Sequence, residues 1–350
     1  MMKEKDIWET AHKRIFDLYG DMPDLLIVSR FYSEKQAFMQ YGVANYFNKL
    51  AMLRHEAENT GGLLIVNNAI ASCFVAYLLG AVDESPLPAH YYCPKCKTVE
   101  WRGGECVLDL RERTCSCGER MLADGFDIPY MTYLPYAKML KNDHHSLFQN
   151  SLSDVVSLCK RLERESGIST EKIDLNDNLV KEKILTASFD RLANRASENI
   201  IKKMIVDRKP KSYAELLKLI ALAHGTYTWL GNAERLLANN LCSLLEIPAT
   251  RDELFVTVRD AMLECGFSDT GFAFDTAEKA RHGYYFKNGM DSYTAGTLQM
   301  LGFGDWFTDY LKSTEYMSTK ALAVMELKYS IVLNWYKTYY PREYIKVVAE

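Results

Sequence analysis

Cys93-Pro94-Lys95-Cys96 and Cys115-Ser116-Cys117-Gly118 are the two stretches that decide how the middle of this sequence folds. Zinc prefers four soft ligands in a tetrahedron, and two cysteine pairs carried by two tight turns supply them. Pro94 and Gly118 suit such turns. The pattern predicts a zinc ribbon with a structural zinc ion held by Cys93, Cys96, Cys115 and Cys117. Because a ribbon this small buries little apolar surface, we expect metal binding to supply its folding free energy.

The ligand set has alternatives. The second cysteine pair is one residue tighter than the usual Cys-x-x-Cys spacing, so Cys106 is an alternative ligand, and a set of unrelated buried thiols is the competing interpretation. No histidine lies between the two motifs, which favours a structural site over a catalytic site with an open position. The remaining cysteines sit in apolar stretches, and we expect them to be small core residues: Cys73, Cys159, Cys242 and Cys265.

Helical patterns flank the cysteine segment on both sides. Before it, apolar spacing and turn signals predict helices over residues 7–19, 25–41 and 69–79, and a buried strand over residues 63–66. After it, residues 137–350 are predicted to be mostly helical, whereas Val99, Trp101 and Val107 indicate short strands inside the ribbon. The expected fold class is mainly α, with a small α+β N-terminal part, an embedded zinc ribbon and a multi-domain helical body.

The composition is typical of a globular protein. The chain has 350 residues, 48% of them hydrophobic and 25% charged, and no apolar run reaches the length of a transmembrane helix. Its first residues are polar and charged and do not form a secretory signal, so we expect a cytoplasmic protein with reduced cysteines. The net charge of −4 is not that of a typical nucleic-acid binder, so any contact with DNA must come from local basic patches.

Three longer motifs surround and follow the cysteine segment. They are Pro86-Leu87-Pro88-Ala89-His90-Tyr91-Tyr92-Cys93-Pro94-Lys95-Cys96, Asp124-Gly125-Phe126-Asp127-Ile128-Pro129-Tyr130 and Ala223-His224-Gly225-Thr226-Tyr227-Thr228-Trp229-Leu230-Gly231-Asn232-Ala233. In this order they resemble the zinc segment, the exit from that segment and a fingers signature of the PolC-type bacterial DNA polymerase III alpha subunit. Shorter matches follow the family order: Ser212-Tyr213-Ala214-Glu215-Leu216, Arg251-Asp252, Asp305-Trp306-Phe307 and Tyr316-Met317.

The resemblance covers about residues 10–350, in two blocks with a large gap between them. It implies a palm-like remnant over residues 1–85, a zinc-ribbon segment over residues 86–136 and a helical fingers-like domain over residues 137–350. The residues of this chain that carry the fingers signature are His224, Gly225, Trp229, Gly231 and Asn232. We expect His224 to hold its turn through a hydrogen bond and not to bind a metal ion.

Two catalytic elements of the family have no counterpart in this sequence. The family carries a Pro-Asp-Ile-Asp type motif after the zinc segment, whereas this chain passes from residues 129–136 directly to Ala137-Lys138-Met139-Leu140-Lys141-Asn142-Asp143. The family's Gly- and Ser-rich phosphate loop with an arginine is replaced by Val66-Asn67-Asn68-Ala69-Ile70-Ala71-Ser72. Nucleotidyl transfer needs metal ions held by carboxylates. We therefore expect no catalytic residues, and Mg²⁺ only if polymerase activity is retained.

The remaining acidic residues have simpler interpretations than catalysis. Asp174 or Asp177 is better interpreted as the N-cap of a following helix than as a metal ligand. Asp124 and Asp127 flank a turn and are expected to be structural.

Two basic clusters are the candidates for contacts with DNA phosphates. The first precedes the fingers signature and the second follows it: Lys202, Lys203, Arg208, Lys209, Lys211 and Lys218, then Lys279, Arg281 and His282. A solvated helix face is the alternative, because Asp207 and Glu215 are interspersed. Tyr227 and Trp229 either stack on bases or belong to the core, and we favour the core.

Three functions remain open on the sequence alone. The first is a catalytically inactive PolC-like protein that binds DNA or a replication protein. The second is a minimal or split DNA polymerase completed by another chain, and the third is a protein-interaction scaffold. DNA and replication proteins are the expected partners, and no membrane contact is expected.

Overall fold

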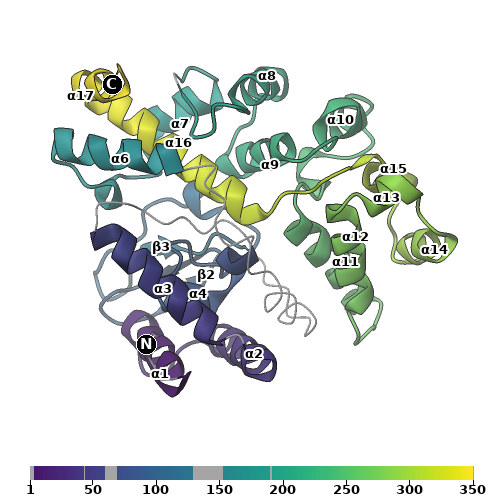
Figure 1. Ribbon diagram of the computed structural model, residues 1–350, viewed down its shortest axis with the longest axis horizontal. Coiled ribbons are helices and arrows are strands. Elements are labelled where there is room, and N and C mark those ends of the chain that lie inside the picture. Colours follow the sequence, from purple (N-terminus) through teal and green to yellow (C-terminus); the bar gives the residue numbers. More distant parts are fainter. Residues whose placement is uncertain (1–3, 43, 60–68, 129–152, 190, 350) are drawn as a thin grey trace. The chain divides into compact units, whose positions relative to one another are not determined.

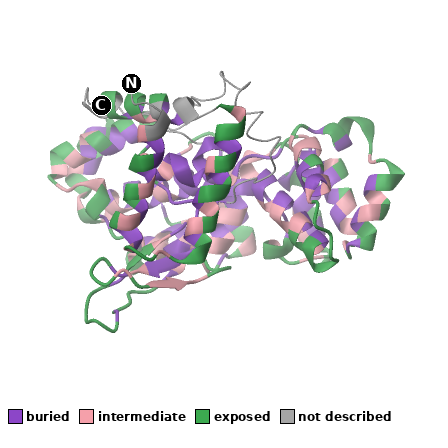
Figure 2. Cartoon of the chain, turned by 90° about the horizontal axis from the view of Figure 1, so that it is seen from below, coloured by how far each residue is buried: buried purple, intermediate pink, exposed green. Residues whose placement is uncertain are grey.

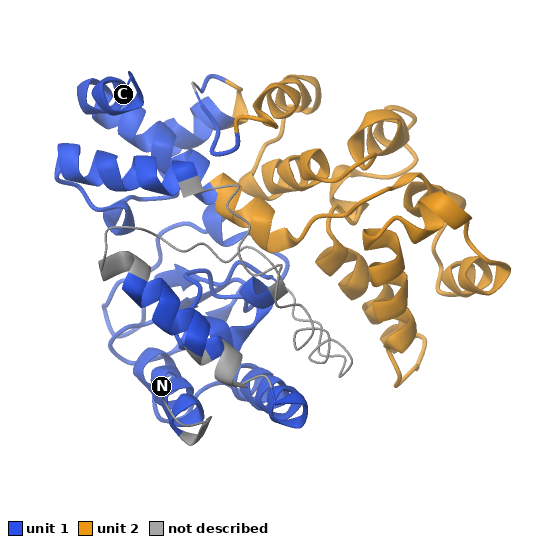
Figure 3. Cartoon of the chain, viewed as in Figure 1, with its two compact units in different colours: residues 1–184, 188–194, 328–350 blue, residues 185–187, 195–327 orange. Residues whose placement is uncertain are grey.

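The computed structural model describes residues 4–42, 44–59, 69–128, 153–189 and 191–349 (Figure 1). The chain forms two compact units (Figure 3). Unit 1 comprises residues 1–184, 188–194 and 328–350, and unit 2 comprises residues 185–187 and 195–327. Helix α16 (Lys320–Tyr339) begins in unit 2 and ends in unit 1. None of the described helices combines the length and the apolar character that crossing a bilayer requires.

Unit 1 begins with three helices, α1 (Glu4–Tyr19), α2 (Leu25–Tyr41) and α3 (Ala44–Asn59). The first two confirm the helices predicted over residues 7–19 and 25–41. Local chemistry sets the limits of α2: the Asp24 side chain accepts a hydrogen bond from the Leu26 amide, and Gly42 adopts a left-handed conformation with φ of 64°.

Two short helices follow where one helix was predicted over residues 69–79. They are η1 (Ala69–Ser72) and α4 (Phe74–Leu78), separated by the extended residue Cys73. The start of α4 is capped by a carboxylate from far back in the chain, because Glu34 of α2 accepts hydrogen bonds from the amides of Phe74 and Val75 at 3.0 and 2.9 Å. The strand predicted over residues 63–66 lies outside the described residues.

A three-stranded antiparallel sheet forms the base of the cysteine segment. Its strands are β1 (His90–Tyr92), β2 (Val99–Trp101) and β3 (Leu122–Asp124), in the order β2-β1-β3. His90 is opposite Trp101 on one side and Asp124 on the other. The prediction of a strand at Val107 was wrong, because residues Val107–Asp109 form the short helix η2. Val107 and Leu108 are both buried. Successive side chains of a strand point to opposite faces, so two neighbours are rarely both buried at the edge of a small sheet.

The rest of unit 1 is helical in its described part. It contains α6 (Ser153–Ser166), η3 (Thr170–Lys172), α7 (Asn178–Leu185), the second half of α16 and α17 (Pro341–Ala349). Asp177 caps α7, since its Oδ1 accepts a hydrogen bond from the Val180 amide at 2.9 Å. This confirms the helix-cap interpretation of that residue.

Unit 2 consists of short helices in its described residues. They are α8 (Glu198–Arg208), α9 (Tyr213–His224), η4 (Trp229–Ala233), α10 (Glu234–Ala238), η5 (Leu244–Glu246), α11 (Arg251–Glu264), α12 (Gly271–Arg281), α13 (Tyr284–Asn288), α14 (Ser292–Met300), α15 (Asp305–Ser313) and the start of α16. Buried and exposed residues alternate along most helices, as amphipathic packing requires (Figure 2). The mainly helical fold with a small sheet and a cysteine cluster is confirmed.

The isolated cysteines divide into two groups. Cys73 and Cys159 are buried, as predicted for small core residues. The same prediction was wrong for Cys242, which is half-buried, and for Cys265, which is exposed. Both have apolar neighbours in sequence, but Cys265 is the C-terminal cap of α11 and Cys242 lies in the turn after α10, where side chains face solvent.

Candidate metal centre

The cysteine segment leaves and rejoins the body of unit 1 at one place. The Phe126 amide donates to the Ser85 carbonyl at 2.8 Å, and the Asp127 amide donates to the Leu87 carbonyl at 2.9 Å. Gly125 has a φ of 90°, and a Cβ on it would lie 2.2 Å from the Pro88 carbonyl oxygen. Only glycine allows this close approach, so the two motifs that begin and end the segment are paired in space.

Each cysteine pair sits on its own hydrogen-bonded turn. In the first turn, the Cys93 amide donates to the Thr98 carbonyl at 2.9 Å, and the Lys97 amide donates to the Cys93 carbonyl at 3.0 Å. In the second turn, the Cys115 amide donates to the Glu119 carbonyl at 2.8 Å, and the Gly118 amide donates to the Cys115 carbonyl at 2.9 Å. Lys97 and Gly118 both have positive φ, at 64° and 83°, which closes each turn tightly.

The four sulfur atoms converge although the second pair is short. Cys93, Cys96, Cys115 and Cys117 have all their sulfurs within 4.8 Å of one another. The Sγ atoms of Cys93 and Cys117 are 3.5 Å apart, and those of Cys96 and Cys115 are 3.4 Å apart. A tetrahedral zinc ion with bonds of about 2.3 Å would place its sulfurs about 3.8 Å apart. The cluster therefore fits zinc, and Cys106 is not one of its members.

The surroundings favour a structural ion. Four thiolates fill a tetrahedral zinc ion and leave no position open for substrate. Cys93 and Cys115 are buried, whereas Cys96 and Cys117 are exposed. Hydrogen bonds from the Thr98 hydroxyl and amide lower the pKa of the Cys96 thiol to about 6, whereas desolvation and the contacts with the other three thiols raise the pKa of the Cys117 thiol to about 11.

Asp124 is the last residue of β3, and its side chain makes structural contacts. Its carboxylate accepts hydrogen bonds from the Tyr77 hydroxyl at 3.0 Å and from the Gly125 amide at 2.7 Å. His90 faces it, and the two imidazole nitrogens contact the Pro88 carbonyl and the Tyr19 hydroxyl. Burial raises the pKa of Asp124 and lowers that of His90. These contacts agree with the structural role predicted for Asp124.

The first basic cluster separates into exposed and engaged side chains in unit 2. Lys203 is exposed in the middle of α8, and Lys209 and Lys211 are exposed at its C-terminal cap and in the turn after it. Lys202 pairs with Glu198 at 2.8 Å, and the Lys218 ammonium lies 2.9 Å from Glu253. The three exposed lysines are therefore the ones that remain available for phosphate.

Arg208 and the second basic cluster make internal contacts. Arg208 donates to the Glu234 carbonyl at 3.2 Å and lies over the Trp229 ring. Arg281 is 3.7 Å from the Glu278 carboxylate, whereas the Lys279 ammonium lies over the Tyr284 ring at 5.6 Å. Arg208 thus connects α8 to α10, whereas the Arg281–Glu278 contact lies within α12, and Lys279 is partly exposed beside Tyr284.

His224 makes a hydrogen-bond contact that its sequence neighbourhood does not reveal. Its Nε2 contacts the Glu326 carboxylate of α16, more than a hundred residues later in the chain. Glu326 has no exposed surface and also accepts a hydrogen bond from the Ser197 hydroxyl at 3.1 Å. The contact ties α9 to α16 within unit 2 and agrees with the structural role expected for this histidine.

The rest of the fingers signature shapes one rigid turn. The Asn232 amide group is buried and donates to the carbonyl oxygens of Tyr227 and Tyr310, at 2.8 and 3.1 Å. Gly225 admits no side chain, because a Cβ would lie 2.4 Å from Thr228, and Gly231 has a φ of 67°. Trp229 is buried, as favoured from the sequence, whereas Tyr227 is 55% exposed and does not belong to the core.

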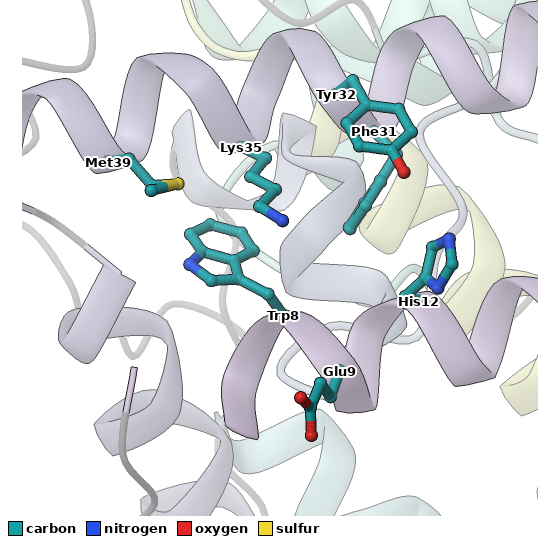
Figure 4. Close-up of a pocket in the computed structure, with 7 residues that line it drawn as sticks. All are labelled: Trp8, Glu9, His12, Phe31, Tyr32, Lys35 and Met39. Atoms are coloured by element: carbon teal, nitrogen blue, oxygen red, sulfur yellow. The ribbon is translucent and has the colours of Figure 1, made fainter. Parts of the chain in front are cut away.

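A pocket between α1 and α2 was not predicted from the sequence. It has a volume of about 550 Å³ and is lined by Trp8, Glu9, His12, Phe31, Tyr32, Lys35 and Met39 (Figure 4). The Lys35 ammonium lies 5.7 Å from the centre of the Trp8 ring and 5.9 Å from that of Tyr32. The missed signal is a second apolar stripe on α2, where the exposed residues Leu25, Tyr32 and Met39 are seven positions apart.

Comparison with known proteins agrees with the resemblance noted in the sequence. The chain is 21% identical to "DNA polymerase III PolC-type" of Staphylococcus haemolyticus strain JCSC1435 and, equally, to that of Staphylococcus aureus strain MW2. Each alignment is 476 residues long and covers 97% of this chain and 32% of the relative. No family model matches the chain. The chain is thus distantly similar, over nearly its full length, to about a third of PolC-type DNA polymerase III.

Proposed function

We propose that this protein is a zinc-containing relative of PolC-type polymerases that has no polymerase activity of its own and binds DNA or a replication protein. The observation that carries the proposal is the near-complete alignment of the chain with a third of a polymerase whose acidic palm motif it lacks. Such a protein would act in the cytoplasm, beside the replication machinery.

The length of the alignment supports a loss within the polymerase body. It extends over 476 residues, more than the 350 residues of the chain, so the relatives carry stretches that this chain lacks. In the family, the acidic motif follows the zinc segment, whereas this chain passes there directly to residues 137–143. We therefore assign the acidic motif to one of these missing stretches. The segments involved, residues 66–68 and 129–152, lie outside the described residues.

The distribution of carboxylates supports the same proposal. Metal-dependent nucleotidyl transfer needs several carboxylates that converge on two ions. Among the described residues, the four cysteines are the one group of potential metal ligands that converges in this way. The sequence of residues 129–152 contributes a single carboxylate, Asp143. A split polymerase would therefore need a second chain to supply the acidic residues.

Zinc would act in this protein as a structural element. The cluster of Cys93, Cys96, Cys115 and Cys117 closes two turns that have little apolar core of their own. The three-part division into a palm-like remnant (1–85), a zinc ribbon (86–136) and a fingers-like domain (137–350) is part of this proposal.

The DNA-binding half of the proposal rests on Lys203, Lys209 and Lys211. We expect the affinity of the full, zinc-loaded chain for a primer–template duplex to fall as salt rises, because lysines that contact phosphates release counterions. Replacing all three lysines by glutamine should reduce the slope of log Kd against log salt by about 3, roughly one for each lysine. Fluorescence anisotropy with a labelled duplex measures both slopes.

A matched control is Lys312→Gln, since Lys312 is already paired with Asp309 at 2.7 Å. It should leave the slope unchanged. Binding whose salt slope is near zero would contradict the DNA-binding proposal. It would favour the second candidate, a protein-interaction scaffold.

The pocket between α1 and α2 is the observation that favours a scaffold. Its floor is made by the buried rings of Trp8 and Phe31, and its rim by the half-exposed side chains of Tyr32 and Met39. The lining carries one lysine, Lys35, and one carboxylate, Glu9, so it suits a partner segment that places an acidic side chain at Lys35 among apolar side chains. In the described residues, Lys35 contacts rings and has no carboxylate within ion-pair distance.

A further inference from the structure

An exposed aromatic pair stands out on the surface of unit 2. The rings of Tyr227 and Phe286 are stacked, with centroids 5.6 Å apart and planes 22° apart. Tyr227 is 55% exposed and Phe286 42% exposed, and neighbouring Tyr284 is 47% exposed. Large aromatic side chains normally contribute most when they are buried, so three of them open to solvent indicate a surface that is covered by a ligand.

The backbone beneath the pair is held rigidly. Tyr227 adopts a left-handed conformation with φ of 55°, which is uncommon for a residue with a side chain. Asn232 donates to its carbonyl at 2.8 Å, and the preceding Thr226 amide donates to the Tyr316 carbonyl at 3.0 Å. A strained residue fixed by its surroundings is typical of a binding site. The ring is thereby presented outward before any ligand arrives.

The second ring is anchored in the same way. Phe286 lies on α13, which begins directly after Gly283. A Cβ on Gly283 would lie 2.3 Å from the Glu315 carbonyl oxygen, so this helix start is fixed against the chain segment that pairs with Thr226. Both rings therefore rest on one connected piece of backbone.

The short segment that carries Tyr284 and Phe286 is rich in positive charge and lies between the acidic residues Glu278 and Asp291. Residues 279–290 contain three lysine and arginine residues and neither aspartate nor glutamate. Arg281 is engaged with Glu278, whereas Lys287 is exposed and Lys279 lies over the Tyr284 ring at 5.6 Å. Proteins bind single-stranded nucleic acid through aromatic rings interleaved with cations. The bases stack on the rings, and the phosphates contact the cations.

We propose that the Tyr227–Phe286 pair is a stacking platform for a base of single-stranded DNA, with Lys279 and Lys287 contacting the adjacent phosphates. The proposal rests on the DNA-binding function proposed above and names the form of DNA that this surface takes. A duplex is a poor fit, because its bases are already stacked and present no free ring face.

The test measures binding of the full, zinc-loaded chain to three fluorescent probes: a twenty-nucleotide oligothymidylate, an abasic strand of the same length and a duplex. Stacking on an aromatic side chain is worth about 1–3 kcal/mol per base. Tyr227→Ala and Phe286→Ala should therefore each weaken oligothymidylate binding by about 5- to 150-fold and leave abasic-strand binding unchanged. Tyr227→Phe should retain the affinity. Tyr293→Ala, at a tyrosine that is 74% exposed but outside the pair, is the control and should have no effect.

A second measurement needs no substitution. Ultraviolet cross-linking of an oligonucleotide that carries 5-iodouracil should attach it to Tyr227 or Phe286, as mapped by mass spectrometry. Equal binding of the oligothymidylate and the abasic strand, or cross-links only elsewhere, would overturn the platform while the DNA-binding function survives. If none of the three probes binds, the result contradicts both the DNA-binding function and the stacking platform.

Discussion

Glu34 is a carboxylate without exposed surface, and its two oxygens receive the amides of Phe74 and Val75 at the start of α4. Arg30, one turn earlier on α2, donates to the same carboxylate at 2.6 Å and to the Ser72 carbonyl at 2.8 Å. A buried carboxylate is stable only when such donors surround it. Glu34 and Arg30 therefore connect α2 to the break between η1 and α4.

Replacing Glu34 by alanine should lower the free energy of unfolding by about 3–5 kcal/mol, because it leaves the partly buried Arg30 charge and two helix amides without their acceptor. Glu34→Gln keeps one acceptor and should cost less. Urea denaturation followed by circular dichroism measures the change. Gln36→Ala, at an exposed position of the same helix, should stay within about 0.5 kcal/mol. Equal effects of the Glu34 and Gln36 substitutions would contradict the capping role.

At the scale of elements, the cysteine ribbon is the part whose stability depends most on its ligand. Its strands are three residues long, and its two turns are joined through the four sulfurs. Such an element has too little buried apolar surface to persist alone. The metal ion would hold the two turns in register with the sheet.

We predict that the purified chain contains one zinc ion per molecule, as measured by inductively coupled plasma mass spectrometry. Cys115→Ser should lose it, because a serine hydroxyl is a poor replacement for thiolate. Cys106→Ser should keep it, because Cys106 is not among the four converging sulfurs. The contrary result, retention in Cys115→Ser with loss in Cys106→Ser, would show that Cys106 is a ligand.

Local signals made some elements predictable and left others hidden. The limits of α2 follow from Asp24 and Gly42, which act on their immediate neighbours. The four cysteines were predictable as one group because their spacing alone specifies two turns. The break at Cys73 depends on Glu34, and the hydrogen-bond partner of His224 is Glu326, so neither was visible from nearby residues. The stacking of Tyr227 on Phe286 likewise needs the fold of unit 2.

At the scale of the whole molecule, the chain is distantly similar to about a third of PolC-type DNA polymerase III, and we propose that it lacks the acidic centre of that enzyme. It spans about a third of the length of the curated relatives it matches. The described residues supply four converging cysteines and an exposed aromatic pair beside lysines. Structural zinc and surface cations support binding, whereas chemistry on a nucleotide needs converging carboxylates. We therefore expect this chain to bind DNA without synthesising it.

Primer extension tests that separation most directly. The zinc-loaded chain is mixed with a labelled primer–template, Mg²⁺ and all four deoxynucleotides, and the products are compared with a reaction that contains excess chelator. We predict that the primer stays at its original length under conditions in which anisotropy shows it to be bound. Extension that requires Mg²⁺ would contradict the account, because the carboxylates for nucleotidyl transfer would then have to be present in this chain.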